Sequence, residues 1–162
     1  MPKVFVINGT GGSGKSTFIS YCKSFNPKVC EISAVDHVKT VAILAGWDGI
    51  KDERGRKFLA DIKDAMDRYD DLSRKNVDKV IEENPNYIYF INARSPEDIE
   101  YFCNKWDGLS VLIINPRIPP ITSNHADAKV LEYKYDVVIK NDGDLEWLRK
   151  KAGLFMNWNF GY

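Results

Sequence analysis

Residues 4–16 read Val-Phe-Val-Ile-Asn-Gly-Thr-Gly-Gly-Ser-Gly-Lys-Ser, a short apolar run followed directly by a glycine-rich motif. The last eight residues match G-x-x-x-x-G-K-S, the pattern of a phosphate-binding loop between a strand and a helix. Glycines let successive backbone N–H groups point at a phosphate, and the start of the following helix adds partial positive charge. A merely flexible turn would explain the glycines but neither the Lys-Ser pair nor the preceding strand. The motif therefore predicts a nucleotide-binding protein.

The residues of this loop have separate expected roles. Lys15 is expected to neutralise the outer phosphates, and the Ser16 hydroxyl is expected to ligate Mg²⁺. The predicted cofactors are therefore ATP and Mg²⁺. The nucleotide-binding residues expected from the motif are Gly11, Gly12, Ser13, Gly14, Lys15, Ser16 and Thr17.

Length, charge and cysteine content narrow the class of protein. A chain of 162 residues has the length of one domain, 1–162, and its 23 basic and 23 acidic residues cancel, so neither nucleic acid nor an anionic membrane is expected as a partner. Cys22, Cys30 and Cys103 are odd in number and lack metal-site spacing, which predicts reduced, mostly buried thiols. His37 and His125 are too far apart in sequence to suggest a metal site. The first apolar run is too short for a signal peptide, so we expect a soluble, cytoplasmic protein.

Strand-like and helix-like patterns alternate along the chain. This alternation predicts an α/β, three-layer P-loop NTPase fold with a five-stranded parallel sheet and helices on both faces. The expected strands are 4–8, 29–33, 87–92, 109–114 and 137–139, and the expected helices are 15–25, 34–45, 53–69, 72–84, 96–106 and one beginning at 145. Prolines and capping residues set most of these bounds. The aromatic tail, 155–162, is expected to cover the core or to form an interface. A homodimer is one expected assembly of the chain.

Polar side chains follow the predicted strands at one edge of the sheet. Asp36 and Lys39 come just past strand two, Asn92 and Arg94 end strand three, and Arg117 follows strand four. Ligands of open parallel sheets bind beyond the carboxyl ends of the strands, and arginines stabilise a transferring phosphoryl group. Jointly these residues predict a small-molecule kinase with a phosphorylated acceptor. Singly, each is equally well an exposed loop charge, and Asp36 equally well a helix cap.

Several segments resemble the deoxynucleoside monophosphate kinase family, whose members include phage enzymes. They are the phosphate loop, Ser33–Lys39, Asn92–Arg94 with Glu97 after it, Asn124–Asp127 and Lys140–Leu145. The resemblance spans nearly the whole chain. Animal-type phosphomevalonate kinases share this plan, so the resemblance does not name the acceptor.

The resemblance implies roles for particular residues. Asp36, Lys39 and Arg94 would contact the acceptor, within or beside a helical acceptor-binding insertion at about 34–84. Arg117 and a lid-like loop at about 115–127, which contains three prolines, would cover the phosphates. The predicted catalytic residues are Lys15, Asp36, Arg94 and Arg117.

One departure from the family pattern concerns the metal. Where such kinases often carry Asp-Val-Arg, this chain has Asn92-Ala93-Arg94, so a carboxylate is missing there. Mg²⁺ would then rely on Ser16, phosphates and waters. This departure favours an alternative class, a regulatory or degenerate nucleotide-binding protein without turnover. Trp47 and Tyr69 are candidates to stack on an acceptor base, although we expect them to pack in the core.

Overall fold

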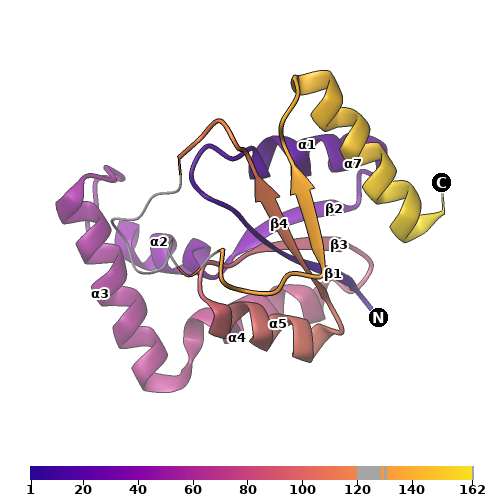
Figure 1. Cartoon of the computed structure of the whole chain (residues 1–162). Coiled ribbons are helices and arrows are strands. Elements are labelled where there is room, and N and C mark those ends of the chain that lie inside the picture. The colour runs from indigo at the N-terminus through magenta and orange to yellow at the C-terminus, as the bar shows by residue number, and fades with distance from the viewer. Residues whose placement is uncertain (120–128, 130, 162) are drawn as a thin grey trace. The chain divides into compact units, whose positions relative to one another are not determined.

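A computed structural model describes residues 1–119, 129 and 131–161. Figure 1 shows the chain, which forms two compact units, one of Met1–Glu31 with Asn86–Tyr162 and the other of Ile32–Pro85. The elements follow in the order β1 (Lys3–Asn8), α1 (Lys15–Phe25), β2 (Val29–Ser33), α2 (Ala34–Leu44), α3 (Glu53–Asp70), α4 (Leu72–Glu83), β3 (Ile88–Asn92), α5 (Pro96–Trp106), β4 (Leu109–Ile114), β5 (Val137–Lys140) and α7 (Leu145–Phe160). Most of the expected lid, and with it Asn124–Asp127, lies outside the described residues.

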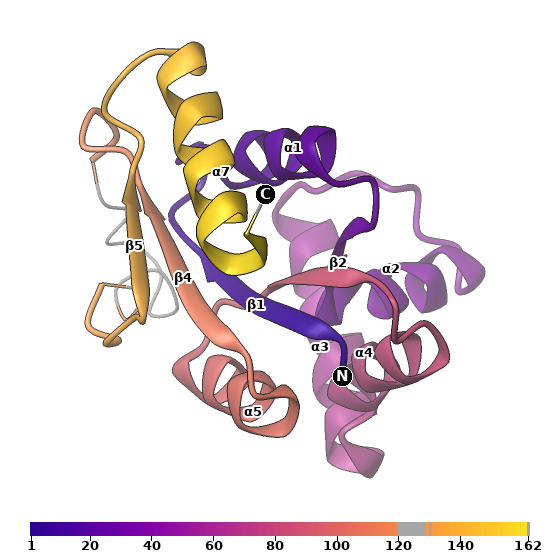
Figure 2. The same cartoon turned by 90° about the vertical axis from the view of Figure 1, so that its right-hand side faces the viewer.

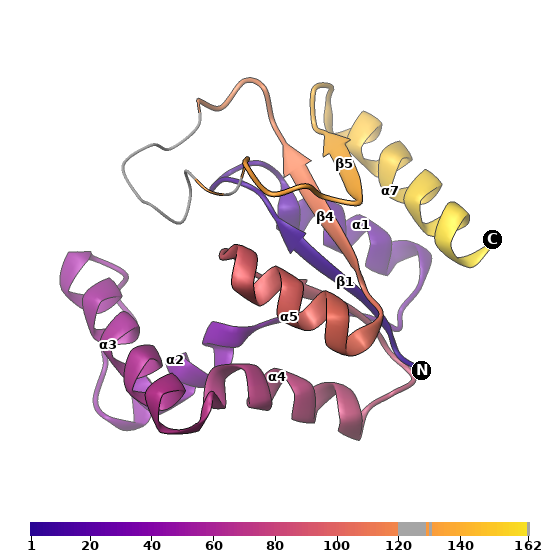
Figure 3. The ribbon, with the colours of Figure 1, turned by 60° about the horizontal axis from the view of Figure 1, so that its bottom comes forward.

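The sheet has the strand order β2-β3-β1-β4-β5. Strand β1 pairs in parallel with β3, where Ile7 lies opposite Asn92, and with β4, where Ile7 lies opposite Val111. β4 pairs in parallel with β5. Helices α1 and α7 cover one face of the sheet (Figure 2), and α5 covers the other (Figure 3). The predicted α/β fold with a five-stranded parallel sheet and helices on both faces is therefore confirmed.

Aromatic rings fill the core between the sheet and the helices α1 and α7. Phe155 of α7 packs edge-on against Phe5 of β1, with ring centroids 4.8 Å apart, and against Phe18 of α1, at 5.5 Å. All three rings are buried, as is Met156. Residues 155–160 of the tail thus belong to α7, and its buried residues cover the core, which is one of the two roles expected from the sequence. Trp158, on the same helix, is 78% exposed.

The second unit consists of α2, α3 and α4 (Figure 3). Asp52 caps α3 by accepting a hydrogen bond from the backbone N–H of Gly55 at 2.7 Å. The loop before α3 lies so close that a Cβ atom on Gly55 would sit 2.0 Å from the carbonyl oxygen of Ile50. Trp47 is half-buried in this loop, and its indole N–H donates to the same carbonyl at 3.2 Å. The bounds of this unit lie close to those of the expected insertion, whose role in acceptor binding stays a prediction.

Two expectations about side-chain burial are corrected. Tyr69 does not pack in the core, because α3 lies at the surface and leaves this ring 83% exposed. Of the cysteines, Cys22 is buried, whereas Cys30 and Cys103 are only partly buried. Burial raises the pKa of Cys22 to about 12 and that of Cys103 to about 11, so these two thiols are not activated nucleophiles. Within the described residues, every helix is too short or too polar to cross a membrane.

Candidate active site

The phosphate loop joins β1 to α1 in a conformation that requires its first and last glycines. Gly9 has φ 153° and Gly14 has φ 103°, values that side chains with a Cβ atom rarely adopt. Space excludes other residues as well, because a Cβ atom on Gly9 would lie 2.5 Å from the carbonyl oxygen of Ile113. The loop closes with a hydrogen bond from the Ser13 N–H to the Thr10 carbonyl, 3.1 Å long. Sequence and geometry therefore agree on a tightly formed phosphate loop.

Lys15, the first residue of α1, curls back over this loop. Its ammonium nitrogen donates to the carbonyl oxygens of Gly9 at 2.5 Å and Thr10 at 3.3 Å. The side chain is partly buried, so its charge is less screened by water than that of a surface lysine. The positive charge of Lys15 is thereby held at the loop, beside the start of α1, where anions are favoured.

A carboxylate that the sequence analysis missed lies beside the Ser16 hydroxyl. Glu31 of β2 accepts hydrogen bonds on one oxygen, Oε1, from the Ser16 hydroxyl at 3.4 Å and from the amide nitrogen of Asn92 at 2.7 Å. β2 and β3 are neighbours in the sheet, and this brings Glu31 to Asn92 across 61 residues of sequence. The structure thus places a carboxylate on the strand next to β3, in contact with Asn92.

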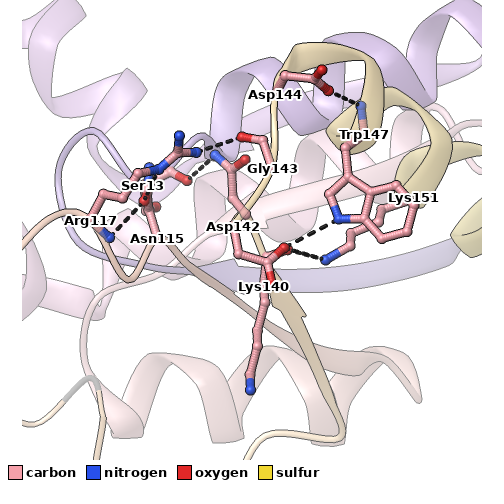
Figure 4. A network of polar contacts seen from close by, with 10 residues as sticks. Ser13, Asn115, Arg117, Lys140, Asp142, Gly143, Asp144, Trp147 and Lys151 are labelled. Atoms are coloured by element: carbon pink, nitrogen blue, oxygen red, sulfur yellow. Dashed lines mark hydrogen bonds and ion pairs between the residues drawn. The ribbon is translucent and has the colours of Figure 1, made fainter.

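The turn between β5 and α7 lies against the phosphate loop from the other side (Figure 4). The side-chain amide of Asn141 donates to the carbonyl oxygen of Ser13 at 2.9 Å, and a Cβ atom on Gly14 would lie 2.6 Å from the same amide nitrogen. The Asn141 backbone N–H is itself fixed by the Ile114 carbonyl at 2.7 Å. Asn141 therefore ties the phosphate loop to the ends of β4 and β5. This contact of Asn141 was not predicted from the sequence.

The same turn is stiffened by contacts with the first turns of α7. Asp142 accepts hydrogen bonds from the Trp147 indole N–H at 3.2 Å and from Lys151 at 3.0 Å, and the bond from Lys151 lowers the pKa of this carboxyl group. Asp144 caps α7 by accepting from the Trp147 backbone N–H at 2.8 Å, as predicted. The turn is therefore ordered by its own side chains (Figure 4).

Arg117 extends from the end of β4 to this turn. Its guanidinium group donates to the Gly143 carbonyl at 2.5 Å and to the Asn115 side-chain oxygen at 3.5 Å (Figure 4). The next residue, Ile118, approaches the phosphate loop, since a Cβ atom on Gly12 would lie 3.2 Å from its side chain. The structure thus places Arg117 beside the phosphate loop and bonds it to uncharged oxygens. The catalytic role of Arg117 stays a prediction.

The other candidate residues lie on two separate units. Arg94 is exposed two residues beyond β3, in the unit that carries the phosphate loop. Asp36 and Lys39 belong to α2 in the second unit. There Asp36 completes a capping box with Ser33, whose N–H donates to its carboxylate at 2.8 Å, and Lys39 pairs with Asp36 at 3.6 Å. Capping, the alternative role weighed for Asp36, is therefore present, and acceptor contact by these residues stays a prediction.

Two surface cavities lie away from the phosphate loop. The larger, of about 540 Å³, borders α7 and includes Phe25 and Trp147. The other, of about 450 Å³, lies within the second unit between Trp47 and Phe58. Lys15 lines neither cavity, so neither cavity marks the phosphate-binding site.

Comparison with known proteins gives no match to a protein-family model or to a curated protein. Solved structures do share the fold. Shikimate kinase from Aquifex aeolicus is 18% identical, with a TM-score of 0.53, over 96% of this chain and 97% of its own. Dephospho-CoA kinase from Campylobacter jejuni is 18% identical, with a TM-score of 0.51, over 97% of each chain. Thymidylate kinase from Ehrlichia chaffeensis is 10% identical, with a TM-score of 0.54, over 96% of this chain and 98% of its own.

The fold of this protein is therefore that of the P-loop small-molecule kinases. The similar structures act on different acceptors according to their names, and their identity to this chain is low. The likeness thus supports the kinase fold and does not select a family, so the resemblance to deoxynucleoside monophosphate kinases enters only the proposal below.

Proposed function

We propose that this protein is an ATP-dependent phosphotransferase that moves the terminal phosphate of ATP to a small phosphorylated acceptor, and that this acceptor is a nucleoside or deoxynucleoside monophosphate. The observation that carries the proposal is the phosphate loop itself, with the Lys15 ammonium held over it and Ser16 beside the Glu31 carboxylate. Lys15 would balance the charge of the outer phosphates. Because phosphoryl transfer needs positioning and charge stabilisation more than covalent chemistry, these groups match the reaction.

Mg²⁺, when bound, would offset the charge that develops on the transferring phosphoryl group. The residues present fit such an ion: the Ser16 hydroxyl and the Glu31 carboxylate are hard oxygen ligands, 3.4 Å apart, and Mg²⁺ keeps several waters of its own. The described residues form no cluster of three or more acidic, histidine or cysteine side chains that could hold a metal. A site completed by phosphates and waters agrees with that finding.

The acceptor is proposed from the arginine and lysine that follow the strands. Arg94 lies just past β3, and Lys39 and Asp36 lie just past β2. Cations at the carboxyl ends of parallel strands suit an acceptor that already carries a phosphate. A non-nucleotide phosphate, such as phosphomevalonate, fits the same charges and is the alternative acceptor.

The competing proposal is a nucleotide-binding protein without turnover, which the missing acid at position 92 favours. Glu31 weakens that argument, because it supplies a carboxylate bonded to Asn92 itself. The test is ADP release, coupled to an indicator reaction, with a panel of ribonucleoside and deoxynucleoside monophosphates and phosphomevalonate. ADP release that depends on a nucleotide acceptor supports the proposal. ADP release with phosphomevalonate alone would assign the acceptor to the non-nucleotide phosphates. Tight ATP binding without any turnover supports the regulatory alternative.

Alanine at Arg94 or at Lys39 is expected to raise the KM for the acceptor by about tenfold or more while leaving the KM for ATP nearly unchanged. A residue that binds only the acceptor phosphate contributes a charge-assisted hydrogen bond of about 1.5–3 kcal/mol to that substrate alone. Steady-state kinetics with each substrate varied in turn measures the two constants.

Matched controls for these two variants are available on the surface. Arg149→Ala removes an exposed arginine of α7 that is paired with Glu146, and Lys23→Ala removes an exposed lysine of α1. Both controls are expected to leave the two KM values unchanged. If Arg94→Ala and Lys39→Ala changed only the KM for ATP, the assignment of these residues to the acceptor would be wrong.

A further inference from the structure

The contact between Glu31, Ser16 and Asn92 joins three elements that are distant in sequence. Ser16 lies in the first turn of α1, Glu31 in β2 and Asn92 at the end of β3. The Glu31 oxygen Oε1 accepts from both of the other side chains, at 3.4 Å and 2.7 Å. All three residues belong to the unit that carries the phosphate loop. The geometry of this triad is thus independent of the second unit.

The charge of Glu31 distinguishes this triad from an ordinary surface ion pair. Both of its donors are neutral, and among the residues that the structure describes no lysine or arginine forms an ion pair with Glu31. Two other acids of the candidate site do have cationic partners: Asp36 is paired with Lys39, and Asp142 with Lys151. A full negative charge is therefore left beside the loop hydroxyl, and a divalent cation is the partner that would balance it.

Hydrogen-bond chemistry lets the triad bind such a cation without being rearranged. A serine hydroxyl has one hydrogen and two lone pairs, so Ser16 can donate to Glu31 while a lone pair faces the metal. An ionised carboxylate offers about four acceptor positions on its two oxygens. Two bonds on Oε1 therefore leave Oε2 able to accept from a metal-bound water. Asn92, by donating to Oε1, fixes the direction of the carboxylate.

We propose that Glu31 is the carboxylate of the Mg²⁺–nucleotide site of this protein and that Asn92 is the residue that orients it. Where the kinases that this sequence resembles often carry an acid at the end of the third strand, this chain has an amide donor, and the carboxylate lies on the neighbouring strand. The inference rests on the nucleotide-binding part of the proposed function and not on turnover or on the acceptor.

The test measures how strongly Mg²⁺ tightens nucleotide binding. The dissociation constant of ADP is determined by calorimetry in excess Mg²⁺ and in EDTA for the intact chain and for Glu31→Gln. Groups that orient metal ligands typically contribute about 10–100-fold to metal affinity, so the tightening by Mg²⁺ is expected to fall by about tenfold or more in the variant. ADP binding in EDTA is expected not to weaken, because the variant removes a negative charge beside the phosphates. The melting temperature is expected to stay unchanged, because glutamine keeps an oxygen that can accept from Asn92.

A reciprocal exchange sharpens this test. In the double variant Glu31→Gln with Asn92→Asp, the amide stands on β2 and the carboxylate on β3, so the hydrogen bond between them is reversed and the charge is restored. At least part of the lost Mg²⁺ effect is expected to return. A matched control, Glu146→Gln, removes an exposed acid from α7 and is expected to change nothing.

The possible results separate this inference from the proposed function. Unchanged tightening by Mg²⁺ in Glu31→Gln would overturn the inference whether or not the protein is a kinase. A lost Mg²⁺ effect that the double variant recovers supports it, even if every acceptor in the panel fails. Absence of any Mg²⁺-dependent binding of ADP to the intact chain would overturn both the inference and the proposed function.

Discussion

Replacing Lys15 by alanine is expected to reduce phosphoryl transfer by about 10²–10³-fold and to leave the fold intact. The ammonium group is the positive charge held over the phosphate loop, bonded to the carbonyls of Gly9 and Thr10. Removing a preorganised group of this kind from a phosphoryl-transfer site typically costs about 10²–10³-fold in rate, and here ATP affinity is expected to fall as well. ADP release at saturating acceptor measures the effect.

The stability of the Lys15→Ala variant is expected to change little. The two lost hydrogen bonds are partly exposed, and a net value of about 1 kcal/mol each bounds the cost. For a chain of this length, 1 kcal/mol shifts the melting temperature by about 2–4 °C. Lys23→Ala, which removes an exposed lysine from the last turn of the same helix, is the control and should retain full activity. Near-normal turnover in Lys15→Ala would show that this loop is not the catalytic phosphate site.

The fold was predictable because local residues mark the ends of its elements. Ser95 and Asp144 cap α5 and α7. In the phosphate loop, Gly9, Gly12 and Gly14 stand where the backbone has positive φ. These signals depend only on neighbours in sequence. The alternation of strands and helices then restricts the fold class, since parallel strands require crossover connections.

The contacts that were not predicted from the sequence depend on which strands are neighbours in the sheet. Glu31 is the one charged residue of β2, which reads Val-Cys-Glu-Ile-Ser, and this is the signal that could have drawn attention to it. Its meaning appears only when β2 lies next to β3 and Asn92 becomes its donor. No local pattern reports a contact across 61 residues. Asn141 was missed for the same reason, because its partner, Ser13, lies 128 residues away.

The burial of side chains on α3 could not be predicted from helical spacing alone. The apolar residues of α3 recur with the period of an amphipathic helix, yet Tyr69 is 83% exposed and Phe58 lies at the surface. Periodicity predicts which side chains share a face, but coverage of that face depends on the packing of other elements. Thus the prediction of a helix at 53–69 is confirmed, whereas the expectation that Tyr69 packs in the core is wrong.

Arg117 is expected to contribute more to the rate of phosphoryl transfer than to nucleotide binding. Arg117→Ala is expected to lower kcat by about 10³-fold, because an arginine that meets the charge developing on a transferring phosphoryl group can contribute that much. The KM for ATP is expected to change by only a few fold. Arg117 stands at the end of β4, next to the phosphate loop, and its guanidinium group is bonded to the neutral oxygens of Gly143 and Asn115. Among the residues that the structure describes, no acid pairs with Arg117, so none of these acids has to release it before it meets a phosphate.

The structure also suggests the strongest competing explanation, in which Arg117 serves only to fasten the end of β4 to the turn before α7. In that case Arg117→Ala would loosen the turn, and through Asn141 the phosphate loop, so ATP affinity and melting temperature would fall together while kcat stayed near normal. Arg117→Lys separates the two roles further: lysine keeps the charge but not the planar fork of donors, so a charge role predicts partial recovery of kcat. Arg149→Ala, which removes an exposed arginine of α7, is the matched control. A normal kcat with weakened ATP binding in Arg117→Ala would assign this arginine to the architecture of the nucleotide site, because an interaction made only in the transition state cannot be lost without slowing the transfer itself.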